Sequence, residues 1–105
     1  MSASTAFDEL VGVMTLSFDS TRSKMFGCPC IKQGKRAYTI FKDDRVAFRI
    51  GLDRVNQLKA TFPDTCNFDP SGKGKPMKDW FEAGPEHAAQ WRDWATEAMF
   101  YLEEK

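Results

Sequence analysis

Two cysteines separated by a single proline are the residues whose types and spacing most directly suggest chemistry. Cys28, Pro29 and Cys30 lie in the segment KMFGCPCIKQGK at residues 24–35. Such a pair could undergo thiol redox chemistry or supply ligands to a metal ion. In an extended strand their Cα atoms would be about 6.5 to 7 Å apart, the outer limit for a disulfide. We therefore expect structural thiols on one strand face together with Phe26, with a redox role for Cys28 and Cys30 as an alternative.

The other metal-ligating residue types do not form a second close pair in the sequence. A structural zinc site needs about four ligands, and the remaining side chains are Cys66, His87 and scattered carboxylates. His87 is the single histidine, and we expect an exposed position near the start of the last helix, with a general-base role as the weaker hypothesis. We expect no catalytic residue, no metal site and no cofactor.

A lysine-rich loop could contact phosphate groups. Lys73, Lys75 and Lys78 crowd the segment SGKGKPMK, whose glycines would let the backbone approach an anion. If the loops are adjacent, further basic residues could join them: Lys32, Lys35 and Arg36. The segment lacks the spacing of a nucleotide-binding P-loop. A solvated loop is the main interpretation, and weak, salt-sensitive nucleic-acid binding is the alternative.

Composition limits the class of protein. The chain has 105 residues, of which 42% are hydrophobic, and its 15 basic residues balance 15 acidic ones. These values predict one folded domain spanning residues 1–105. Because the net charge is zero, we expect no overall electrostatic attraction to nucleic acid or membranes. The chain contains no apolar run of about 18 residues and no signal-peptide pattern. With an odd number of cysteines, which favours reduced thiols, we expect a soluble cytoplasmic protein.

Periodicity predicts three helices around a set of strands. Apolar residues at helical spacing predict helices over 5–17 and from 52 to about 62, and a third from Gly84 nearly to Lys105. We expect the third helix to bury some set of Trp91, Ala95, Ala98, Met99 and Leu102. The polar segment 19–23 reads as a connection to a strand near 24–32, and Pro29 places that strand at an edge or at a bulge. Further strands are expected at 36–42, 45–50 and 77–83, with a loop at 69–76.

The central hairpin is expected to turn at Asp43 and Asp44. Lys42 then pairs with Arg45, Phe41 with Val46, Thr39 with Phe48 and Ala37 with Ile50. This register gives a core face of Ala37, Thr39, Phe41, Val46, Phe48 and Ile50. The opposite face is amphipathic, with Tyr38 and Ile40 as an apolar centre that meets water or receives a partner.

Hairpins and helices without regular βαβ alternation predict an α+β domain. We expect an antiparallel sheet of about five strands covered on one side by three helices, in the order α-β-β-β-α-β-β-α.

Four motifs in order resemble the N-terminal domain family of TfoX/Sxy. They are KMFG at 24–27, FRIG at 48–51, GKPMKDW at 74–80 and a closing helix that contains Trp91. The resemblance covers roughly residues 22–102 and implies an α+β fold similar to YjbR-like domains, without established catalytic residues. The CPC segment and the Asp43-Asp44 turn depart from the family pattern. The second, C-terminal domain of TfoX has no counterpart here, so regulation through that domain is not implied.

From these observations we expect a small, non-enzymatic binding or regulatory module. The expected partner is a protein, including a second copy of the chain through the face of Tyr38 and Ile40 or through an edge strand. The alternatives are weak nucleic-acid binding through the lysine loop and thiol chemistry at Cys28 and Cys30. No membrane partner is expected.

Overall fold

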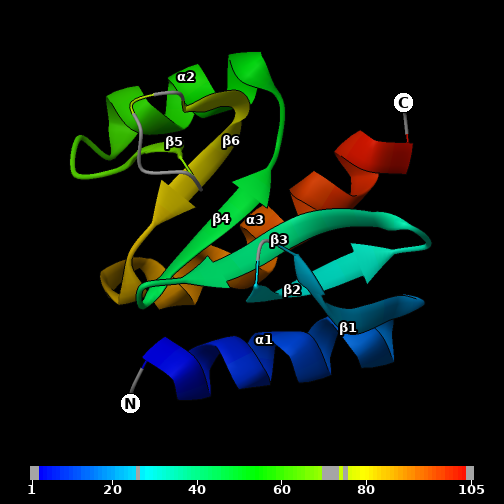
Figure 1. Cartoon of the computed structure of the whole chain (residues 1–105). Coiled ribbons are helices and arrows are strands. Elements are labelled where there is room, and N and C mark those ends of the chain that lie inside the picture. The colour runs from blue at the N-terminus through cyan, green and yellow to red at the C-terminus, as the bar shows by residue number, and fades with distance from the viewer. Residues whose placement is uncertain (1–2, 26, 70–73, 75, 104–105) are drawn as a thin grey trace.

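The chain folds as an α+β domain with a six-stranded antiparallel sheet, as seen in a computed structural model that describes residues 3–25, 27–69, 74 and 76–103. The strands lie in the order β1-β2-β3-β4-β6-β5 (Figure 1). The elements along the chain are α1 (Ala3–Ser17), β1 (Ser20–Met25), β2 (Cys28–Gln33), β3 (Arg36–Lys42), β4 (Arg45–Arg49), α2 (Leu52–Thr61), β5 (Cys66–Phe68), β6 (Met77–Ala83), the 3₁₀ helix η1 (Pro85–His87) and α3 (Ala88–Glu103). No helix among the described residues is both long enough and apolar enough to span a bilayer.

The first strand is the main departure from the predicted element order. Residues 19–23 were expected to form a connection, but β1 begins at Ser20 and pairs with β2 from Ser20↔Gln33 to Met25↔Cys28. β1 is an edge strand of mostly polar and exposed side chains, so it lacks the apolar pattern of a buried strand. Phe26 lies outside the described residues. Four strands therefore precede α2, instead of three.

The central hairpin has the predicted two-residue turn and register. Lys42 pairs with Arg45, Phe41 with Val46 and Thr39 with Phe48. Asp43 and Asp44 adopt φ values of 53° and 62°. Positive φ at both central residues is the geometry of a type I′ turn, which matches the twist of the flanking strands. Aspartate tolerates this left-handed region better than most residues, so the turn forms without glycine.

A β-bulge in β3 changes the predicted faces of the hairpin. Ile31 pairs with Thr39 but Lys32 pairs with Ala37, so Tyr38 is an extra residue on β3. This extra residue places Tyr38 on the helix side and Ala37 on the opposite side. The predicted pairing of Ala37 with Ile50 is therefore wrong, and the two residues belong to different clusters. The strand that contains Pro29, β2, is not at an edge of the sheet, because it pairs with both β1 and β3. The other predicted possibility, a bulge, is present in the pairing of β2 with β3.

The main core lies between the sheet and all three helices, as predicted. It contains Phe7 of α1, Val55 of α2, Trp91 of α3 and the strand residues Val46 and Phe48. In Figure 1, α1 runs below the sheet, α3 passes behind it and α2 lies beside β6. The side chains proposed for burial in the last helix are all buried, and Trp94 joins them: Trp91, Trp94, Ala95, Ala98, Met99 and Leu102.

A second, smaller cluster covers the other face of the sheet. Its buried members are Cys30, Ala37, Ile40, Ala47, Phe68 and Trp80. Beside it, Arg45 pairs with Glu82 at 3.0 Å and Arg49 pairs with Asp79 at 2.9 Å. Both faces of the central strands are therefore buried, and the second face is not the open surface that strict alternation predicts.

Candidate functional site

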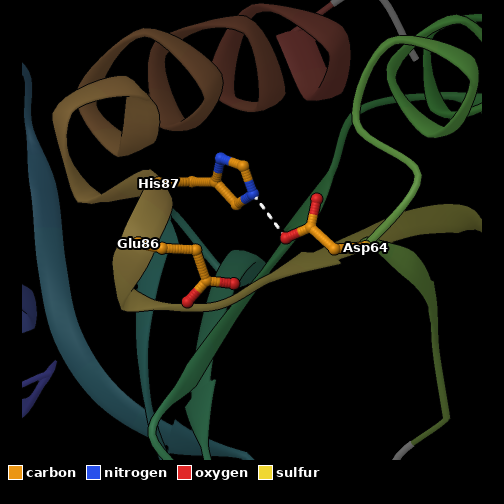
Figure 2. Close-up of side chains that lie close together, drawn as sticks. All are labelled: Asp64, Glu86 and His87. Atoms are coloured by element: carbon orange, nitrogen blue, oxygen red, sulfur yellow. Dashed lines mark hydrogen bonds and ion pairs between the residues drawn. The ribbon is translucent and has the colours of Figure 1, made fainter.

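The turn that follows α2 and the 3₁₀ helix before α3 bring an imidazole next to two carboxylates. His87 Nε2 lies 2.8 Å from Asp64 Oδ2 (Figure 2). Glu86 belongs to the same cluster, and one ligand atom from each of the three side chains lies within 4.8 Å of the others. Asp64 is 23 residues from His87 in the sequence. No short sequence motif contains both residues, so the sequence does not predict the cluster.

Aromatic packing fixes the histidine ring. Its centroid lies 5.0 Å from that of Phe62 and 5.9 Å from that of Trp94. The His87 side chain is only 13% exposed, so the expectation of an exposed helix residue is wrong. Trp94 is held in turn against Phe48 and Phe81 of the sheet. The sheet, α3 and the end of α2 together hold the imidazole in place and leave Nε2 directed at Asp64.

The two carboxylates are exposed and can adjust. The hydrogen bond from His87, more than the contribution of Glu86, holds the pKa of Asp64 below its usual range. Asp64 is therefore an anion over most of the pH range. The His87 ring meets a carboxylate and not a hydroxyl or a thiol, so this contact resembles a ligand cluster more than a nucleophile with its base.

A glycine leaves room for the Glu86 carboxylate. A Cβ placed on Gly84 would lie 2.6 Å from Oε2 and 2.7 Å from Oε1 of Glu86. The carboxylate therefore occupies the space that any other residue at position 84 would fill. Gly84 itself has φ −82° and ψ 179°, an extended conformation open to other residues. The local benefit of this glycine is space for Glu86, and not conformational freedom.

Cys28 and Cys30 form no disulfide, and Cys30 belongs to the second cluster, against which Cys28 packs. Cys30 is 0% exposed and Cys28 is half-buried beside it, so the two share a strand face as predicted. Burial raises the pKa of the Cys30 thiol. Cys66 is exposed as a residue, but its sulfur is partly shielded from water. This partial desolvation, together with the hydrogen bond to Glu82, raises the pKa of the Cys66 thiol as well. A raised pKa lowers the thiolate fraction that redox reactions require.

The predicted basic patch is only partly within the described residues. Lys73 and Lys75 lie outside them. Lys78 is exposed on β6, whereas Lys35 and Arg36 are exposed where β2 turns into β3. Arg36 also donates a hydrogen bond to the carbonyl oxygen of Leu102, at the C-terminal end of α3. Nucleic-acid binding at these side chains stays a prediction, which a DNA titration at low salt would test.

The predicted contact face around Tyr38 and Ile40 is not exposed. Both side chains are 0% exposed. Tyr38 turns to the helix side at the bulge and shares a 2.6 Å hydrogen bond with Ser20, while Ile40 lies in the second cluster. Alternation along a regular strand placed them together, and the extra residue in β3 separates them. A contact surface must therefore be sought elsewhere on the described part of the chain.

Exposed apolar side chains occur instead near the end of α1 and on α3. Leu16 is 91% exposed and Phe100 is 50% exposed. The Phe100 ring lies 6.1 Å from Phe18, which directly follows α1. Leu16 lies on the face of α1 opposite its buried residues, so we call only the pair Phe18 and Phe100 the helix-end patch. A hollow of about 600 Å³ adjoins it, lined by Ser17, Phe18, Arg92, Asp93, Thr96 and Glu97.

Searches of protein-family models, curated proteins and solved structures found no match to this chain. The resemblance to the TfoX N-terminal family therefore stays a prediction that rests on the four sequence motifs.

Proposed function

We propose that this chain is a small, non-enzymatic binding module, similar to TfoX N-terminal domains, that acts by contact with a second copy of itself. The observation that supports this most directly is the helix-end patch. Phe100 is 50% exposed and its ring lies 6.1 Å from that of Phe18, so two aromatic side chains meet at this surface, whereas most exposed apolar residues are scattered singly.

Burial of the patch would favour association. Fully burying a leucine or phenylalanine side chain contributes about 1.5 to 3 kcal/mol. Two such side chains per copy would offset only part of the translational and rotational entropy that association loses. We therefore expect a weak, concentration-dependent dimer and not an obligate one.

The charges beside the patch favour a second copy over a strongly charged partner. Arg92 and Asp93 are exposed, adjacent on α3 and opposite in sign, and both line the hollow next to Phe18. In a two-fold dimer the same surface meets itself, so a surface with both signs can pair Arg92 of one copy with Asp93 of the other. The balanced charge of the whole chain also permits two copies to approach without net repulsion.

Sedimentation velocity over a range of protein concentrations tests the proposal. We expect the weight-average sedimentation coefficient to rise with concentration, and Phe100→Asp to abolish the rise by placing a charge in the patch. The matched control is Leu52→Asp, which places the same charge at an exposed apolar residue on α2. A chain that stays monomeric at every concentration, or a rise that Phe100→Asp leaves intact, would refute the proposal.

A further inference from the structure

We propose that Asp64, Glu86 and His87 bind one divalent transition-metal ion of the zinc type. This site is separate from the helix-end patch and does not depend on self-association. It is assembled from the turn after α2 and from η1, two segments that the tertiary structure brings side by side (Figure 2).

The spacing of the donor atoms suits such an ion. Zinc binds imidazole nitrogen and carboxylate oxygen at about 2.0 to 2.2 Å, so the ligands of a tetrahedral site lie about 3.4 Å from one another. The three donor atoms here lie within 4.8 Å of one another, and His87 Nε2 and Asp64 Oδ2 are 2.8 Å apart. The required separation falls between these values. Rotations of the exposed Asp64 and Glu86 side chains are enough to open the short contact and close the longer ones.

The donor set selects the class of metal. Imidazole suits zinc, copper, iron and nickel, whereas magnesium and calcium prefer sites made of oxygen alone. One imidazole with two carboxylates therefore favours Zn²⁺ over Mg²⁺. Three protein ligands would leave a fourth position for water, the arrangement of an open zinc site and not of a closed structural one.

One ligand is held rigidly while the other two can move. Phe62 and Trp94 restrict the His87 ring, so little freedom is lost there when a metal binds. The Asp64 and Glu86 side chains are exposed, so both carboxylates can turn toward a bound metal ion.

Gly84 positions the third ligand. An alanine at this position would place its Cβ where the Glu86 carboxylate lies, 2.6 Å from Oε2. Because the backbone of Gly84 is extended, alanine can be accommodated there, and the flexible carboxylate is the group that must move. Gly84→Ala should therefore weaken metal binding while it leaves the fold intact.

Isothermal titration of the full chain with ZnCl₂, and separately with MgCl₂, tests the site. We expect one Zn²⁺ per chain and much weaker Mg²⁺ binding. Asp64→Asn and His87→Gln should each lower the Zn²⁺ affinity at least about tenfold, and Gly84→Ala should lower it by a smaller factor. Asp53→Asn is the matched carboxylate control, because Asp53 lies in the first turn of α2, about 12 Å along the helix axis from its other end.

The thiols require their own control, because cysteine also binds zinc. Cys66→Ser should leave the Zn²⁺ affinity unchanged, and Co²⁺ substituted for Zn²⁺ should give no thiolate-to-metal absorption band. Asp64 is an exposed residue, so its variant stays folded even if His87→Gln does not, which far-ultraviolet circular dichroism checks. No Zn²⁺ binding, or binding that Asp64→Asn leaves intact or Cys66→Ser removes, would overturn the proposal.

Discussion

Replacement of Tyr38 by phenylalanine should remove both a buried hydrogen bond and a distinct alkaline transition. The Tyr38 hydroxyl shares a 2.6 Å hydrogen bond with Ser20 Oγ, which itself donates to Gln33 at 2.9 Å. Because Ser20 uses its proton on Gln33, the phenol is the donor to Ser20. Phenylalanine keeps the ring and leaves no large cavity, so the expected loss is about 1 kcal/mol of unfolding free energy. This corresponds to a decrease of roughly 4 °C in Tm.

The alkaline behaviour follows from the Tyr38 pKa. Burial raises that pKa from 10 to about 12. Below pH 10 the phenol is protonated in both the folded and unfolded states, and its contribution is complete. Above pH 10 the unfolded state loses the proton first, so folding stability falls until about pH 12. At 1.36 kcal/mol per pKa unit, the loss is at most about 2.7 kcal/mol.

Urea unfolding at pH 8 and at several values between 10 and 12 measures this effect. Lysine deprotonation also changes stability in this range, so the informative quantity is the difference between the wild type and Tyr38→Phe. We expect the roughly 1 kcal/mol advantage of the wild type to shrink as the pH rises above 10 and, if the full alkaline loss occurs, to change sign before pH 12. Tyr101→Phe is the control, since it removes the other tyrosine, which is partly exposed, and should keep the full alkaline loss. An alkaline loss of equal size in Tyr38→Phe and wild type would refute this account of the Tyr38 environment.

Three further outcomes are expected. Asp64→Asn should weaken the dependence of folding stability on acid pH. The lowered pKa of Asp64 stabilises the folded state above the unfolded-state pKa near 3.8, and this stabilisation is lost as the pH falls through the folded-state pKa. Denaturant unfolding curves from pH 5 to pH 2 would show the difference. Gly51→Ala should cost about 1 to 3 kcal/mol in urea unfolding, because φ is 97° and a Cβ would lie 2.9 Å from Tyr101 Cε1. In thiol titration of the native protein Cys66 should react first and Cys30 only on unfolding, and a fast phase that persists in Cys66→Ser would contradict this.

Local patterns in the sequence determine most of the elements. Helical spacing places α2 and α3, and the turn at Asp43 and Asp44 sets the register of β3 and β4, because a two-residue loop leaves only one pairing. The same patterns predict that the helices share one core. They miss β1, because a strand with one exposed face and polar residues carries no apolar alternation.

Tertiary structure alone decides the sites. A one-residue bulge at Tyr38 depends on how β2 pairs with β3, and it reverses the alternation from which the contact face was inferred. The cluster of Asp64, Glu86 and His87 forms because α2 and α3 pack on the same side of the sheet, which joins residues 23 positions apart. Alternation and helical spacing are short-range properties of the chain, whereas both of these features arise from contacts between distant segments.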